Sequence, residues 1–116
     1  MNKKLIVAAL IACLMPFGAY AAGAIAVDDE MGEEPGYGIA LGEDTQSDAA
    51  KTAMKNCRKV GNHECRVVVK FEKCGAYAAS KKYFGVGTGS TKAKARDAAL
   101  EECGNSNCKI IVADCE

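Results

Sequence analysis

The sequence predicts an α+β domain built from a duplicated β-β-α-β unit, with about six strands and two helices packed on one face of the sheet. Two observations predict this class. Glycine-rich strand patterns, an alanine-rich helical stretch and three cysteines occur in the same order in residues 23–74 and again in residues 75–116. The six cysteines of these repeats are an even number, which in a short exported chain is typical of a disulfide framework.

Each repeat begins with two short strands. Residues 23–27 alternate small and apolar side chains, and after a loop closed by Pro35-Gly36 residues 37–42 alternate large side chains with glycine or alanine. The glycines leave one face of that strand bare, which lets a helix approach closely. Residues 75–79 and 84–89 repeat both strands.

An alanine-rich helix should follow each pair of strands. Thr45 is an N-cap candidate with an acidic residue three positions later, and Thr91 is its counterpart in the second repeat. Lys92 and Lys94 fall in the first turn of the second helix, where they oppose the helix dipole, so something other than local helix stability is expected to have placed them. The predicted inward positions are Ala49, Ala53, Met54 and Cys57, then Ala95, Ala99, Leu100 and Cys103.

A strand should close each repeat after a glycine-asparagine helix stop at 61–62 and 104–105. In these strands the pattern predicts that Val67, Val69 and Phe71 share one face, as do Ile110 and Val112.

Six cysteines allow 15 connectivities, and the repeat selects among them. A helix-end cysteine is followed closely by a strand-start cysteine in both halves, which predicts the bridges Cys57–Cys65 and Cys103–Cys108. Cys74 and Cys115 occupy equivalent positions, so we expect them to form the third bridge and to join the two halves.

The N-terminus has the pattern of a secretory signal peptide. Lys3 and Lys4 precede an apolar run broken by Pro16, and a small-residue cleavage pattern ends at Ala21. We expect residues 1–21 to be removed, leaving residues 22–116 as a single exported domain, periplasmic or secreted, with no transmembrane segment. The alternative is a lipoprotein anchored through Cys13, but the residues after it stay apolar where a tether is usually polar.

Basic and acidic residues are equal in number but unevenly distributed along the chain. With 15 basic and 15 acidic residues, the chain lacks the net positive charge typical of nucleic-acid binding, and no nucleic-acid partner is expected. The loop at 28–34 is acidic and its counterpart at 80–82 is basic. Two solvated turns are the simplest interpretation; the alternative is a molecule with two differently charged ends, one of which meets a partner. The candidate partner-binding residues are Lys81, Lys82, Tyr83, Lys92 and Lys94.

No pattern in the chain indicates catalysis. His63 is the only histidine, and it has no counterpart in the second repeat. The acidic loop lacks the spacing of a calcium loop, and the glycines at 85, 87 and 89 are better explained by strand packing than by a phosphate loop. We therefore expect no catalytic residues, no metal and no cofactor, and not an enzyme.

The order of these elements resembles a known family. The segments that carry the resemblance are Gly23 to Asp29, Tyr37-Gly38, Cys65 to Val69, Cys74 to Ala76 and Cys108 to Val112, together with the two alanine-rich helices. They are similar to the small exported bacterial domain catalogued as domain of unknown function 4189. The resemblance implies an exported domain without an established activity, and no catalytic residues. This chain lacks the tryptophans found in the glycine-rich strands of many members.

We expect an exported, non-enzymatic, disulfide-stabilised binding protein whose partner is a protein or an envelope component. The alternative is an inhibitor or immunity protein that blocks a hydrolase or toxin in the cell envelope. The sequence predicts neither the identity of the partner nor the oligomeric state.

Overall fold

The computed structural model describes residues 21–31 and 34–116. Residues 1–20 of the predicted signal peptide, with Cys13, lie outside the described residues. The elements in chain order are β1 (Ala22–Asp28), the 3₁₀ helix η1 (Asp29–Met31), β2 (Gly36–Glu43), α2 (Gln46–Lys59), β3 (Arg66–Phe71), β4 (Cys74–Ala79), β5 (Phe84–Gly89), α3 (Lys92–Cys103) and β6 (Lys109–Cys115). The predicted α+β class, with its β-β-α-β order taken twice, is confirmed.

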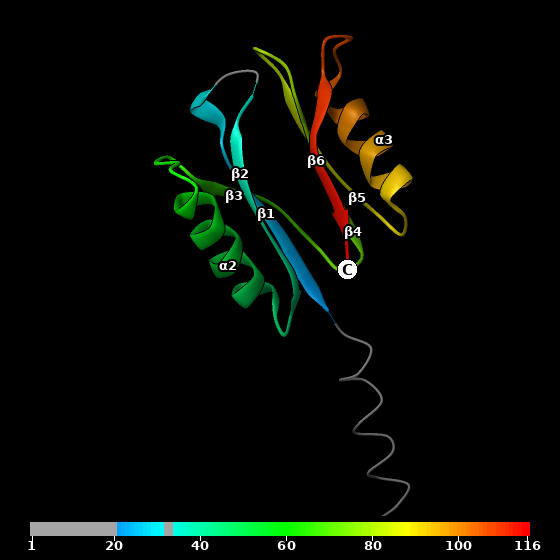
Figure 1. Ribbon diagram of the computed structural model, residues 1–116. Helices are drawn as coiled ribbons and strands as arrows, with labels where there is room; N and C mark the ends of the chain where they lie inside the picture. Colours follow the sequence, from blue (N-terminus) through cyan, green and yellow to red (C-terminus); the bar gives the residue numbers. More distant parts are fainter. Residues whose placement is uncertain (1–20, 32–33) are drawn as a thin grey trace, which may run out of the picture.

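The strands form two antiparallel sheets of three strands each, ordered β2-β1-β3 and β5-β4-β6. The two sheets lie face to face, with α2 outside the first and α3 outside the second (Figure 1). The predicted placement of both helices on one face of a sheet is therefore corrected: each sheet has its own helix, on its outer side. The physical reason is that each sheet has two apolar faces, and a helix can bury only one of them.

In the central strand of each sheet, alternate residues face the helix and the other sheet. In β1 the small residues Ala24 and Ala26 face α2, while Ile25 and Val27 face the other sheet. All four side chains are fully buried. The layer between the sheets also contains Tyr77 from β4, so the large side chains of both units meet in the middle of the molecule.

The glycine faces of β2 and β5 lie against the helices, as predicted. A Cβ added at Gly38 would overlap the backbone of Cys57 and Ala53, and one added at Gly87 would overlap the backbone of α3. Gly42 is different, because its surroundings are open and its φ of +68° is the left-handed conformation that glycine adopts without strain.

A β-bulge falls at the same place in both units. Ile25 pairs with Val69 but the next residue of β1 pairs with Val67, so Val68 is extra; in β6 the extra residue is Ile111. The bulge turns Val67 toward α2 and leaves Val69 between the sheets. The predicted shared face is therefore confirmed for Val69 and Phe71 but wrong for Val67, and in β6 it is wrong because Ile110 and Val112 face opposite sides. Strict alternation does not hold across a bulge.

The helix ends follow the predicted signals. The Thr45 and Thr91 hydroxyl oxygens accept the backbone N–H of the third residue of their helices at 3.0 and 3.2 Å, and Gly104 ends α3 with a φ of +67°. Among the predicted inward positions Leu100 is the exception, since it is 36% exposed.

Three disulfides join Cys57–Cys65, Cys103–Cys108 and Cys74–Cys115, which is the predicted pairing. One part of the prediction is wrong. Cys74 is the first residue of β4 and pairs in register with Cys115 of β6, so this bridge links two strands of the second sheet and does not join the halves. The equivalent register position of the first sheet, next to the Gly23–Phe71 pair, holds Ala22 and Glu72.

Candidate binding surface

The two units run in the same direction, so their equivalent loops lie at the same end of the molecule (Figure 1). We call this the hairpin end, and it consists of the β1–β2 connection, the β4–β5 turn at 80–83 and the turns after the two helices, at 60–65 and 104–108. The opposite end holds the helix N-termini and is called the helix-start end. The predicted site residues divide between these two ends.

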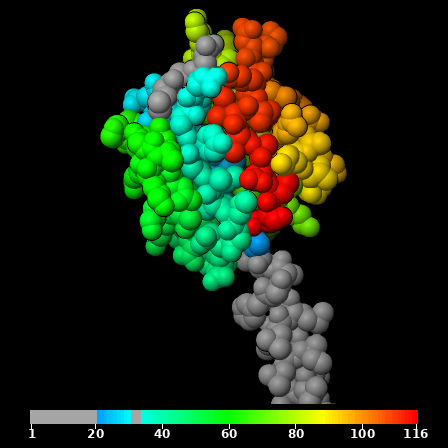
Figure 2. Space-filling view, viewed as in Figure 1, coloured from blue at the N-terminus to red at the C-terminus, as the bar shows by residue number. Residues whose placement is uncertain are grey.

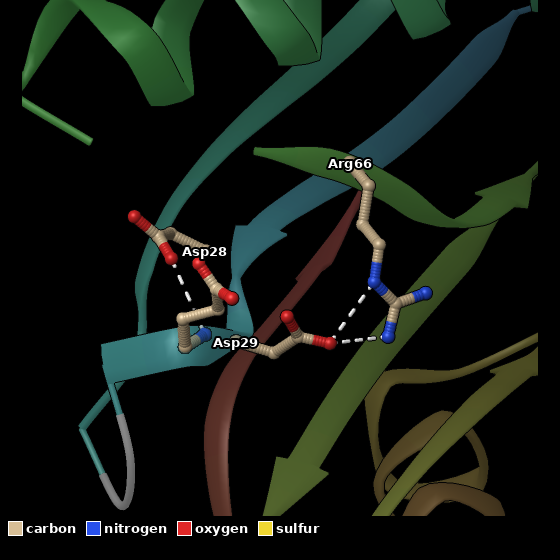
Figure 3. Close-up of polar contacts among 4 residues, drawn as sticks. Asp28, Asp29 and Arg66 are labelled. Atoms are coloured by element: carbon tan, nitrogen blue, oxygen red, sulfur yellow. Dashed lines mark hydrogen bonds and ion pairs between the residues drawn. The ribbon is translucent and has the colours of Figure 1, made fainter. Parts of the chain in front are cut away.

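Arg66 ties the two units together at the hairpin end. Its Nε donates to Asp29 Oδ2 at 2.9 Å, a second guanidinium nitrogen donates to the same oxygen, and Figure 3 shows both contacts. The guanidinium also lies 5.5 Å from the ring centroid of Phe84, whose ring stacks on Tyr77 with centroids 6.1 Å apart. Arg66 therefore links the acidic connection of the first unit to the aromatic side chains of the second.

Tyr77 is held as a neutral phenol. Burial raises the pKa of Tyr77 above its usual range, the nearby Asp29 carboxylate raises that pKa further, and Arg66 opposes the shift. A neutral tyrosine in the layer between the sheets contributes to packing and cannot act as a general base at neutral pH.

Asp28 has an architectural role. It is 5% exposed. One carboxylate oxygen accepts a hydrogen bond from the backbone N–H of Glu30 at 3.3 Å (Figure 3). The other accepts hydrogen bonds from the backbone N–H groups of His63 and Glu64, at 3.3 and 3.4 Å. His63 thus contributes its backbone to the turn before β3, while its side chain is exposed. In residues 21–31 and 34–116 no group of three acidic, histidine or cysteine side chains is arranged to hold a metal ion.

Lys81, Lys82 and Tyr83 lie together in the β4–β5 turn, where they line a hollow of about 220 Å³ with Ser80, Asn105 and Asn107. Tyr83 is 52% exposed. Hydrogen bonds close both turns: Ser80 and Tyr83 exchange two, at 2.8 and 3.2 Å, and the Asn107 N–H donates to Asn105 Oδ1 at 2.8 Å. These bonds fix the backbone of both turns, and the hollow between them has cationic and aromatic side chains on one side and amide side chains on the other.

Lys92 and Lys94 are not part of this surface. They begin α3 at the helix-start end, one full length of β5 away, and a six-residue strand spans about 20 Å. Lys92 instead borders a hollow of about 390 Å³ between β2 and β6, with Arg96, Tyr37, Ile39 and residues 110–114. The predicted group of five residues is thus two separate surfaces.

The described acidic residues of the first loop, Asp28 to Glu30 and Glu34, lie at the same end as the basic turn, which corrects the idea of two oppositely charged ends. The acidic loop is also partly neutralised: besides the Arg66 contact, Lys109 Nζ donates to Glu34 Oε1 at 2.5 Å. This lysine lowers the pKa of the exposed Glu34 carboxyl. The cations of the β4–β5 turn, Lys81 and Lys82, form no ion pair within the described residues.

The sequence did not lead us to predict that Asn105 and Asn107 line the hollow, or that Arg66 links the two units. The position of the asparagines could have been predicted, because a helix that returns along a strand brings its C-terminal turn back to the beginning of that strand. Nothing in the sequence marked Arg66, because its partners are 37 residues earlier and 18 residues later in the chain.

The comparisons with known proteins agree with this fold. The family described as Domain of unknown function (DUF4189) matches residues 22–115. The chain belongs to this family. The NMR structure of Rv1813c from Mycobacterium tuberculosis is similar in fold, with a TM-score of 0.57 and 21% sequence identity over 84% of this chain and 76% of that one. No curated protein matches the chain.

Two further observations bear on where this family member acts. Disulfides form and persist in oxidising compartments, so three bridges in a small domain fit an extracytoplasmic location. In the part of the chain that the structure describes, no helix has the length and apolar composition required to cross a bilayer.

Proposed function

We propose that the chain is an exported, non-enzymatic binding protein, and that the hollow at the hairpin end contacts a protein or an envelope component. The observation that carries the proposal is the exposed Tyr83 beside Lys81 and Lys82, on the rim of a hollow between two hydrogen-bonded turns. Tyrosine supplies a rigid, amphipathic contact at low entropic cost, and flanking cations select partners and speed their approach.

The chemistry of the described residues supports a binding role over a catalytic one. The hollow is lined by lysine, tyrosine, serine and asparagine, and no cysteine thiol is free within the two repeats to act as a nucleophile. His63 lies outside the hollow and anchors a turn through its backbone. A lysine- and amide-lined hollow suits acidic or hydroxyl-rich groups, such as those of envelope glycans and acidic protein segments.

Reversing the charge of the β4–β5 turn tests this proposal. Immobilised residues 22–116 should capture a specific component from an envelope extract of the producing cell. Lys81→Glu/Lys82→Glu and Tyr83→Ala should each weaken that binding about tenfold or more, by surface plasmon resonance, because each removes part of the rim. The lysine pair acts through charge, so its loss should be larger at low salt.

Lys70→Glu/Lys73→Glu is the matched control, because it makes the same charge change at two exposed lysines outside the hairpin end. It should leave the affinity unchanged. Equal losses in both charge-reversed pairs would show that only net charge matters, and salt-independent binding that survives the turn variants would place the interface elsewhere.

The second candidate is an inhibitor that inserts the same turn into a hydrolase or toxin. It is favoured by the shape of the hairpin end, where the β4–β5 turn projects beyond the body of the molecule (Figure 2). Inhibition of a peptidoglycan hydrolase by the purified protein, lost in Tyr83→Ala, would favour this role. Binding to an envelope component without inhibition would favour the first.

A further inference from the structure

The two helices have opposite charges at equivalent positions on their outer faces. Counted from the N-cap threonines, residues 3, 6 and 10 of α2 are Asp48, Lys51 and Lys55. The same positions of α3 are Lys94, Asp97 and Glu101. Every charge in this stripe is reversed between the two units.

The stripes point away from the molecule. Their spacing of three and four residues places each on one helix face, opposite the buried Ala49, Ala53 and Cys57 of α2 and their counterparts in α3. All six charged residues are exposed. Within the described residues none of them forms an ion pair, and the one side-chain hydrogen bond joins Lys94 Nζ to Ser90 Oγ at 3.5 Å.

Local helix stability does not explain the stripe of α3. Lysine in the first turn and glutamate near the end both oppose the helix dipole. Like charges also stand four residues apart, Asp97 with Glu101 in α3 and Lys51 with Lys55 in α2, and these pairs are unfavourable. They offset the favourable opposite-charge pairs three residues apart, Lys94 with Asp97 and Asp48 with Lys51, so pairing within each helix does not account for its stripe. A helix with the reversed stripe placed opposite would set each of these charges beside one of opposite sign and so offset the unfavourable contacts.

The fold presents the two stripes so that this can happen between copies. Both helices start at the same end of the molecule and lie on its two opposite outer sides (Figure 1). A second copy displaced across the layers, in the same orientation, therefore sets its α2 parallel to α3 of the first. The three opposite-charge pairs then fall at the same height along the helix axes.

We propose that α2 of one copy docks on α3 of the next, so that the chain self-associates head to tail through its outer helix faces. This interface is heterologous, so association continues from copy to copy until copies run out or a ring closes. All copies in a straight stack keep their hairpin ends on one side. The inference does not depend on which partner the hairpin end binds.

Sedimentation velocity of residues 22–116 at increasing concentration tests the proposal. We expect concentration-dependent association at low ionic strength that weakens at about 0.5 M salt, because exposed charges are then screened. Two charge-reversed variants should each stay monomeric, with dissociation constants raised about tenfold or more. They are Asp48→Lys/Lys51→Asp/Lys55→Glu in α2 and Lys94→Asp/Asp97→Lys/Glu101→Lys in α3.

Mixing the two variants is the decisive step. The reversed α2 has the charge pattern of α3 and the reversed α3 has that of α2, so the mixture should regain association to within about threefold of the parent. Circular dichroism and urea unfolding establish that both variants are folded. A parent chain that stays monomeric at low salt, variants that associate as the parent does, or a mixture that stays monomeric would each overturn the proposal.

Discussion

Replacing Cys74 and Cys115 by alanine should lower the free energy of unfolding by about 4 kcal/mol, the largest loss expected from any of the three bridges. The bridge closes a segment with a sequence separation of 41, and the entropy that a cross-link removes from the unfolded chain grows with the length of that segment. Urea unfolding of the variant, with the other bridges intact, measures the loss.

The control is Cys103→Ala/Cys108→Ala, which removes a bridge with a sequence separation of 5. The same relation gives a loss of about 2 kcal/mol, roughly half as large. Since both variants exchange two cysteines for alanine, the difference between them isolates the loop-length effect. Equal losses, or a larger loss for the short loop, would contradict this assignment.

Replacing Gly87 by alanine should destabilise the protein by about 2–3 kcal/mol. The added Cβ would overlap the backbone O of Ala95 and N of Ala99, and backbone atoms of a packed helix cannot move aside as a flexible side chain can. The helix would have to lift from β5, which separates the buried alanines from the sheet. Thermal and urea unfolding report the change.

The first unit offers a matched position. Ala40 lies where Gly87 lies in the second unit, and it is 3% exposed with its Cβ accommodated against α2. Ala40→Gly should therefore cost only about 1 kcal/mol, through chain entropy and the lost methyl contact. If Gly87→Ala changed stability by less than Ala40→Gly does, the close helix-on-sheet contact would not be what fixes glycine at this position.

Because the sequence contains a repeat, the strands, the helix ends and the disulfide pairing could be predicted from it. Threonine caps, glycine stops and alternation of large side chains with glycine each occur twice, so every local signal had an independent copy in the other half. The same duplication supported the disulfide pairing, since Cys57–Cys65 and Cys103–Cys108 occupy matching places. Local chemistry acting over short distances is what a sequence pattern reports best.

The errors arose where the outcome depended on long-range packing. The alternation places Ile25 and Val27 on one face of a strand, but the local sequence does not determine whether that face packs against a helix or a second sheet. Val68 and Ile111 form bulges that a strict alternation cannot anticipate. Cys74 ends the cysteine pattern of the first repeat in the sequence, but the backbone makes it the first residue of β4.

The candidate site was partly predictable for the same reason. Lys81, Lys82 and Tyr83 are neighbours in the chain, so their grouping needed no tertiary information. Lys92 and Lys94 are also close to them in the sequence, but β5 lies between and places both at the other end of the molecule. Asn105 lies beside this turn because α3 runs back along β5 and ends near the start of that strand. This proximity follows only when the helix is placed against its strand.

Two equivalent units stack sheet against sheet, with a helix on each outer side. An NOE spectrum of isotope-labelled residues 22–116 tests this arrangement. We expect contacts between the ring of Tyr77 and the methyl groups of Ile25, Val27 or Val69, which belong to the other sheet. Absence of these cross-sheet contacts, with contacts between Ala53 of α2 and Ala99 of α3 instead, would contradict it by placing both helices on one face.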